Sequence, residues 1–121
     1  MASIRYLVND VGEAAAFYTG RLGFELSQQF GPAMAILKHG DLTLWLAGPQ
    51  ASAARPMPDG RKPEPGGWNR FVLAVDDLPA LGKELRGQGV TFRNDIVKGP
   101  GGQQILCDDP SGNAIELFRA A

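Results

Sequence analysis

One carboxylate in this sequence stands where a charge is unexpected. Glu116 lies between large apolar residues in the stretch DDPSGNAIELF, residues 108–118, which reads as a strand end, a tight turn and a new strand. A charge in that place either points to water or lines a cleft beside a metal, an arginine or a ligand. Arg5 and Arg70 are the candidate partners. A bidentate carboxylate–guanidinium pair with either arginine would satisfy both charges.

Two similar runs of predicted elements position these residues. In the first run, a helix that is capped by Asp10 and ends at Gly23 comes before the last strands. In the second run, Pro79 is favourable in the first turn of the helix. The predicted strands are 3–10, 24–30, 33–40, 41–48, 68–78, 90–95, 102–109 and 113–118, and the predicted helices are 11–23 and 79–89.

The order of elements repeats, and this repeat predicts the fold. The chain reads as two tandem βαβββ modules, residues 1–48 and 68–121, joined by a proline- and glycine-rich linker or lid loop at 49–67. A module of this size cannot bury its sheet alone. We therefore expect an α+β protein whose curved mixed sheets form an open, barrel-like cleft with the helices outside.

Alternation along the strands assigns the candidate site to one face of the sheets. The apolar sets around Tyr6, Leu44, Leu73 and Ile115 should face the helices. The opposite face then holds the residues that we expect to bind a ligand, namely Arg5, Trp45, Arg70 and Glu116. Such a mixture of aromatic and charged groups is typical of a small-molecule pocket.

Bulk properties exclude several functions. A net charge of -1 gives no signal for nucleic acid. No apolar run approaches the roughly 20 residues of a membrane span, and the N-terminus lacks the pattern of a secretory signal. The single cysteine, Cys107, fits a reducing cytoplasm. We expect a cytoplasmic protein that contacts neither membrane nor nucleic acid.

The repeated module, together with DVGEAAAFYTGRLGFEL and DDPSGNAIELF, resembles the vicinal oxygen chelate superfamily. This superfamily includes glyoxalase I, bleomycin-resistance proteins, fosfomycin-resistance enzymes and extradiol dioxygenases. Its metal-dependent members place His, Gln or Glu at four equivalent positions. With Val8 and Val75 setting the register, the resemblance puts those positions at Ser3, Trp45, Arg70 and Glu116.

Only Glu116 of these four is a plausible metal ligand, because a guanidinium repels cations and an indole offers no lone pair. The resemblance therefore implies a metal-free cleft without a cofactor. It also implies a homodimer, since short members of the family build their clefts from both subunits. The first hypothesis is a binding protein, similar to bleomycin-resistance proteins, for a planar neutral or anionic molecule.

Two further hypotheses stay open. The second is a metal-free lyase, isomerase or glyoxalase-like enzyme in which Glu116 acts as the base and Arg70 as the electrostatic stabiliser. The third is a metal-dependent enzyme with a displaced site that uses Glu116, His39 or aspartates. Paired charges in clefts occur both at ligand sites and as structural ion pairs, so the Arg70–Glu116 pair has both interpretations.

Several other residues carry alternative interpretations. Trp68 either stacks on a ligand or packs as a hinge, and the GPGG stretch at 99–102 is a hairpin turn because it lacks the context of a phosphate loop. Cys107 is interpreted as a buried structural residue and Tyr18 as core. His39 is expected in a turn away from the cleft.

Overall fold

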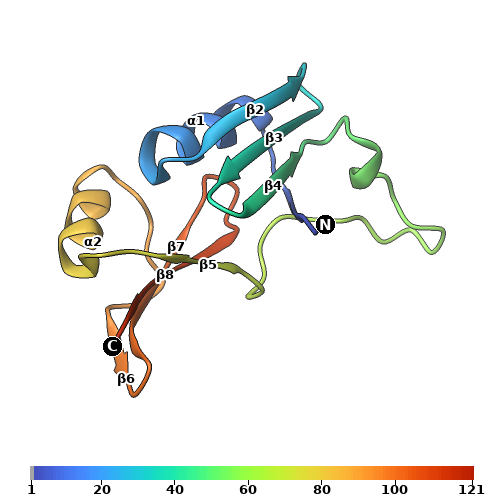
Figure 1. The fold of residues 1–121 in the computed structure, drawn as a ribbon. Coiled ribbons are helices and arrows are strands. Elements are labelled where there is room, and N and C mark those ends of the chain that lie inside the picture. Colours follow the sequence, from blue (N-terminus) through green and yellow to red (C-terminus); the bar gives the residue numbers. More distant parts are fainter. Residues whose placement is uncertain (1) are drawn as a thin grey trace. The chain divides into compact units, whose positions relative to one another are not determined.

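The computed structural model describes residues 2–121. Contacts within the chain divide it into two compact units, of which the first ends at Gly66 and the second spans Gly67–Ala121. Within the described residues, each unit contains one α-helix and one four-stranded mixed sheet (Figure 1). The predicted α+β class with tandem βαβββ modules is confirmed.

The first unit has a sheet with a single parallel pair. Its elements are β1 (Ile4–Leu7), α1 (Val11–Leu22), β2 (Glu25–Phe30), β3 (Met34–His39), β4 (Leu42–Ala47) and the 3₁₀ turn η1 (Ser52–Ala54). The strand order is β1-β4-β3-β2, with β1 parallel to β4 and the other pairs antiparallel. A bulge between Leu26 and Gln28 interrupts the pairing of β2 with β3.

The bounds of α1 follow from its caps, as predicted. The Asp10 side chain accepts a hydrogen bond from the backbone N–H of Glu13 at 2.8 Å, which satisfies a free donor of the first turn. The helix stops at Gly23, whose φ of 74° is accessible to glycine at little cost. Its buried face includes Tyr18, which has no exposed surface and meets the ring of Phe24 edge-on at 5.2 Å. Tyr18 is therefore core, as predicted.

The second unit repeats this topology. Its elements are β5 (Phe71–Ala74), α2 (Leu78–Gly87), β6 (Val97–Gly99), β7 (Gly102–Asp108) and β8 (Ala114–Ala120). The strand order is β5-β8-β7-β6, with β5 parallel to β8. Asp77 caps α2 by accepting a hydrogen bond from the N–H of Ala80 at 3.1 Å. The caps of the two helices are thus equivalent, which fits an internal repeat.

The predicted strand over 90–95 is wrong. Of this segment only Phe92 forms a bridge, to Cys107, and the edge strand β6 lies further on at Val97–Gly99. The reason is a side chain that replaces a backbone partner: Oδ1 of Asn94 accepts the N–H of Leu106 at 2.9 Å. An amide side chain in that role turns the backbone away from the regular ladder.

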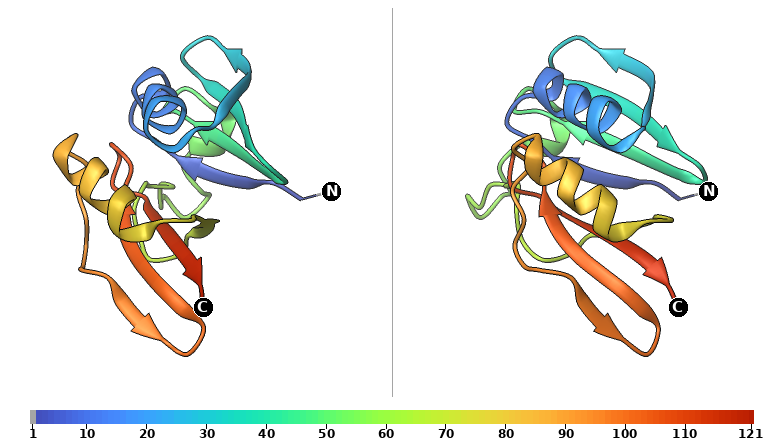
Figure 2. Two further views of the ribbon diagram at one scale, coloured as in Figure 1. Left: turned by 60° about the vertical axis from the view of Figure 1, so that its left-hand side comes forward. Right: turned by 90° about the vertical axis from the view of Figure 1, so that its left-hand side faces the viewer.

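The predicted division of the sheet faces holds in both units. Figure 2 shows α1 along one face of the first sheet and α2 along one face of the second. Helix-facing residues such as Leu44, Leu46, Ile115 and Leu117 are fully buried. Strand alternation assigns Ile4, Leu42 and Val75 to the same faces, but these three residues are only half-buried. Among residues 2–121, no helix combines the length and hydropathy of a membrane span.

Candidate functional site

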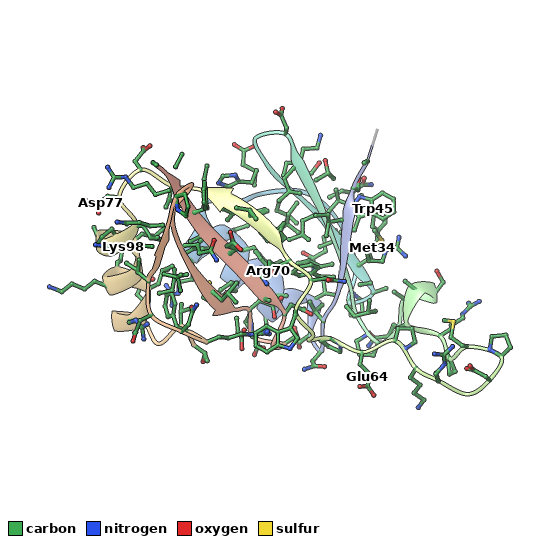
Figure 3. The ribbon with its side chains drawn as sticks, turned by 90° about the horizontal axis from the view of Figure 1, so that it is seen from below. Met34, Trp45, Glu64, Arg70, Asp77 and Lys98 are labelled. Atoms are coloured by element: carbon green, nitrogen blue, oxygen red, sulfur yellow. The ribbon has the colours of Figure 1, made fainter. Side chains whose placement is uncertain are left out.

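Glu116 lies in the middle of β8, opposite Val72 of β5 and Leu106 of β7. Only 8% of the residue is exposed. Arg70 lies directly before β5, and its guanidinium donates to Glu116 from Nε at 3.1 Å and from Nη2 at 2.9 Å (Arg70 is labelled in Figure 3). Of the two predicted partners, Arg70 therefore forms the ion pair.

The pair differs from the predicted bidentate arrangement. Both guanidinium donors reach Oε1 of Glu116, and no hydrogen bond from the described residues reaches Oε2. The remaining guanidinium nitrogen, Nη1 of Arg70, donates to the backbone carbonyl of Trp68 at 3.2 Å. That third bond turns the guanidinium so that one edge meets a single carboxylate oxygen. Glu116 therefore keeps a free acceptor on the open face of the sheet.

A second arginine holds the segment that precedes Arg70. Arg93 donates to Oδ1 of Asp108 at 2.6 Å, to the carbonyl of Gly67 at 2.7 Å and to the carbonyl of Gly112 at 3.0 Å. Its guanidinium also lies 4.6 Å from the centre of the Trp68 ring. Sequence reasoning missed Arg93, because its partners lie far along the chain. Arg93 fixes Gly67 and Trp68, and Trp68 in turn holds Arg70.

The open face of the first sheet carries the other two predicted residues. Arg5 of β1 is directly paired with Trp45 of β4, and its guanidinium lies 4.9 Å from the indole ring centre. Ser3, Ile4, Arg5 and Trp45 line a shallow cavity of about 400 Å³. A guanidinium over an indole is a cation–π contact. Arg5 and Trp45 thus stack on each other, and the exposed guanidinium covers part of one indole face.

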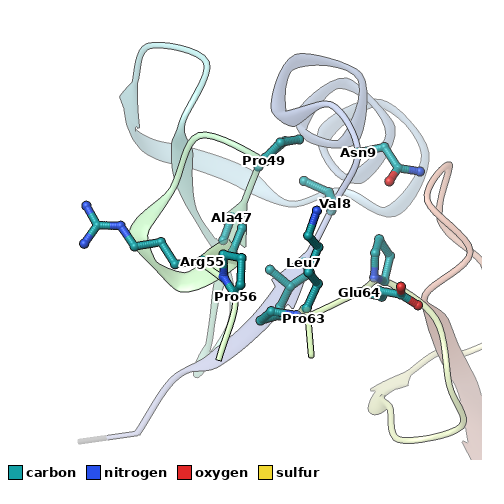
Figure 4. Close-up of a pocket in the computed structure, with 13 residues that line it drawn as sticks. Leu7, Val8, Asn9, Ala47, Pro49, Arg55, Pro56, Pro63 and Glu64 are labelled. Carbon is teal, nitrogen blue, oxygen red and sulfur yellow. The ribbon is translucent and has the colours of Figure 1, made fainter. Parts of the chain in front are cut away.

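A larger cavity of about 450 Å³ lies further along the same sheet, at the carboxyl ends of β1 and β4. Leu7 and Ala47 line it from the strand ends, and the loop after β4 closes the other side with prolines (Figure 4). Arg55, Lys62 and Glu64 are the charged residues of its lining. The prolines of the sequence marked this loop as unusual, but nothing in their spacing located a cavity.

The family's metal positions do not fit a divalent cation here. Ser3, Trp45 and Arg70 offer no anionic or imidazole donor, and the guanidinium of Arg70 already occupies Oε1 of Glu116 at 2.9 Å. Nor do residues 2–121 contain a cluster of three or more His, Cys, Asp or Glu side chains that suits a metal. A displaced site that uses His39 therefore gains no support. The predicted turn at His39 is wrong, because His39 is the last residue of β3, with its ring 5.0 Å from that of Phe24.

The remaining candidates are placed as follows. Trp68 is 67% exposed, so it is not the packed hinge of one interpretation, although Arg93 stacks on it. Cys107 is fully buried, as predicted. Its burial, and after that the neighbouring charges of Asp108 and Asp109, raise the pKa of the Cys107 thiol to about 12. Such a thiol stays protonated and is inert as a nucleophile at neutral pH.

Comparison with known proteins gives the family. Residues 1–117 match the Glyoxalase/Bleomycin resistance protein/Dioxygenase superfamily, and the chain belongs to that superfamily. No curated protein matches the sequence. Members of the superfamily carry different activities on one fold, so membership alone assigns no reaction.

Solved structures show the same fold. A superfamily member from Sphaerobacter thermophilus DSM 20745 is 26% identical, with a TM-score of 0.72 over 98% of this chain and 97% of that one. Lactoylglutathione lyase from Agrobacterium tumefaciens is 21% identical, with a TM-score of 0.74 over 98% and 92%. The fosfomycin resistance protein FosX from Listeria monocytogenes is 13% identical, with a TM-score of 0.75 over 100% and 93%.

Proposed function

We propose that this protein binds a small planar molecule, neutral or anionic, on the open face of a sheet, without a metal ion. The observation that carries the proposal is the ion pair at a family metal position, where Arg70 bonds Glu116 at 2.9 Å. The same geometry orients the guanidinium, so that it presents positive charge to a carbonyl or carboxylate group. Membership of a superfamily that is named for glyoxalase, bleomycin resistance and dioxygenase activity supports a small-molecule ligand.

The first unit offers an aromatic surface of its own for such a molecule. A planar ligand would take the place of the Arg5 guanidinium on the ring of Trp45, and the displaced guanidinium would hold an anionic substituent of the ligand. The proline-rich loop at 49–67 would act as a rigid lid over the neighbouring cavity. We propose that the protein works as a cytoplasmic homodimer, as short members of this superfamily do.

Catalysis is the second candidate, and the free Oε2 of Glu116 favours it. In this scheme Oε2 removes a proton from a carbon next to a carbonyl group, and Arg70 stabilises the negative charge that develops on the carbonyl oxygen. The proton then returns from Glu116 to a different carbon, which gives an isomerisation that needs no external oxidant.

The two tryptophans allow a direct binding test. In the variant Trp68→Leu, Trp45 is the sole indole, and fluorescence titration with 2-naphthoate and with neutral 2-naphthylmethanol reports on the proposed surface. We expect saturable quenching that Arg5→Met weakens for the anion and leaves unchanged for the alcohol. The matched variant Trp45→Leu, which retains Trp68, should show no saturable quenching. Equal quenching in both variants would disprove the assignment of Trp45.

Metal content is tested on the same preparations. Elemental mass spectrometry of the untagged protein, before and after dialysis against divalent ions, should detect no stoichiometric ion. A stoichiometric ion that also disappears in Glu116→Gln would contradict the metal-free proposal. Such a result would favour the metal-dependent chemistry of the superfamily over metal-free binding.

A further inference from the structure

A row of three polar side chains crosses the second sheet on the face opposite to Glu116. In β7, Ile105 and Cys107 are buried on the side where α2 packs. Strand alternation puts Gln103 on that same side. Gln103 is directly paired with Lys98 of β6 and with Arg119 of β8, so all three side chains share one face (Lys98 is labelled in Figure 3).

The polar groups of these three side chains are available for a ligand. Within residues 2–121, neither Lys98 nor Arg119 makes a side-chain hydrogen bond or an ion pair. Oε1 of Gln103 is buried and is the one buried side-chain polar atom in the described part of the chain that lacks a hydrogen-bond partner. Buried acceptors are almost always satisfied, so this atom needs a donor from elsewhere.

The row lines a cavity of about 360 Å³, together with Gly99, Gly102, Ala120 and Ala121. No Asp or Glu contributes to its lining. Gly99 brings no side chain, and no atom lies within 4 Å of the place where its Cβ would be, so this side of the cavity is open to a ligand. Since adjacent strands lie about 4.8 Å apart, the backbones of Lys98 and Arg119 stand roughly 10 Å apart with Gln103 between them. Long basic side chains from both sides can therefore contact one small anion above Gln103.

The neighbouring cavity differs, although it also contains basic residues. Arg86, which lines it with Lys83, is already bonded to Asn94 at 3.0 Å and to Asp95 at 3.3 Å, and it lies over the ring of Phe92. Its charge is thus neutralised within the unit. The Lys98–Gln103–Arg119 row has no such neutralisation.

We propose that this row binds a protonated phosphate group, either inorganic phosphate or a phosphate monoester. Two phosphate oxygens accept from Lys98 and Arg119, and the P–OH group donates to Oε1 of Gln103. This requirement for a donor favours phosphate and its monoesters over sulfate and phosphodiesters, which carry no proton at neutral pH. The site lies on the opposite face of the sheet from Glu116, so it is separate from the proposed ligand surface.

The test compares two anions of similar size. Two-dimensional ¹H–¹⁵N spectra are recorded at pH 6.5 and constant ionic strength while sodium phosphate, sodium sulfate or glycerol 3-phosphate is added. We expect saturable shifts of the Gln103 side-chain amide and of Gly99 and Gly102, with a Kd of about a millimolar for a site with solvent-exposed cations. Phosphate should bind about tenfold more tightly than sulfate, because only phosphate supplies the charge-assisted donor. Tighter binding of glycerol 3-phosphate than of phosphate would identify a monoester as the natural ligand, and the reverse would identify free phosphate.

Variants separate the donor from the charges. Gln103→Leu should abolish the preference for phosphate, and Lys98→Met or Arg119→Met should weaken both anions. Lys83→Met makes the same charge change in the neighbouring cavity and should leave binding unaltered. A chain extended by Gly-Ser after Ala121 should bind phosphate unchanged, which removes any effect of a terminal carboxylate. Shifts that do not saturate, equal binding of sulfate, loss of binding in the extended chain, or a phosphate preference that survives in a folded Gln103→Leu variant would each overturn the proposal.

Discussion

The variant Arg70→Met tests the ion pair on which the candidate site depends. Glu116 has 10% of its side chain exposed, and its only bonds from the described side chains come from Arg70. Removal of the guanidinium leaves a nearly buried carboxylate between Val72 and Leu106 without a partner. Breaking a fully buried pair costs about 3–5 kcal/mol. The Arg70 side chain is 28% exposed and screened by water, which reduces the expected loss of stability to roughly 2 kcal/mol.

Urea denaturation at pH 7 measures this loss, and the chain offers a matched control. Arg61 pairs with Asp59 at 2.8 Å, a shorter ion pair, but 84% of its side chain is exposed. Arg61→Met should therefore not measurably change the free energy of unfolding. The double variant Arg70→Met/Glu116→Met should be more stable than Arg70→Met alone, because it removes the unpaired charge. Equal stabilities of Arg70→Met and Arg61→Met would refute the reasoning.

Three further predictions concern the second unit. Gly102→Ala should destabilise the folded protein by at least about 3 kcal/mol in thermal melts, because Gly102 has a φ of 141° and a Cβ there would overlap the carbonyl oxygen of Arg119 in β8. A Cβ at Gly101 would meet no atom, so Gly101→Ala should be tolerated in the same melts. Asp109→Ala should lower the free energy of unfolding in urea by about 3 kcal/mol, because this 4%-exposed carboxylate accepts the backbone N–H groups of Ser111 and Asn113. Asp95→Ala removes a fully exposed carboxylate and serves as the control. The thiol of Cys107 has a pKa raised to about 12 in the folded state, so its contribution to stability is complete below the unfolded pKa, roughly 9, and is lost as pH rises toward 12. The free energy of unfolding of Cys107→Ala should therefore fall less than that of the unmodified protein between pH 9.0 and about 12. An identical decline in both proteins would contradict the burial effect.

The sequence predicted those features that depend on neighbours along the chain. The caps at Asp10 and Asp77 depend on a backbone group three residues away, and strand alternation places Arg70 and Glu116 on one face without knowledge of the tertiary structure. The ion pair itself joins residues that are 46 positions apart, and only the repeat made it predictable.

The missed features depend on distant groups that no local pattern marks. Arg93 bonds a carbonyl 26 positions before it and another 19 positions after it, and backbone carbonyls carry no sequence signature. The strand expected at 90–95 fails because Asn94 meets Leu106, a contact that strand alternation does not report. The cavity under the proline-rich loop likewise depends on how the loop folds back on the ends of β1 and β4.

The bulge in β2 has a consequence for solubility. This edge strand is exposed along its whole length, and it carries Leu26 and Phe30 with 47% and 48% of their surfaces in solvent. A flat edge strand with such side chains is a template for strands of other molecules, and hence for aggregation. The extra residue, Ser27, puts the backbone donors and acceptors of β2 out of register halfway along the strand. An approaching strand can therefore match only half of this edge, which protects the protein from edge-to-edge association at high concentration.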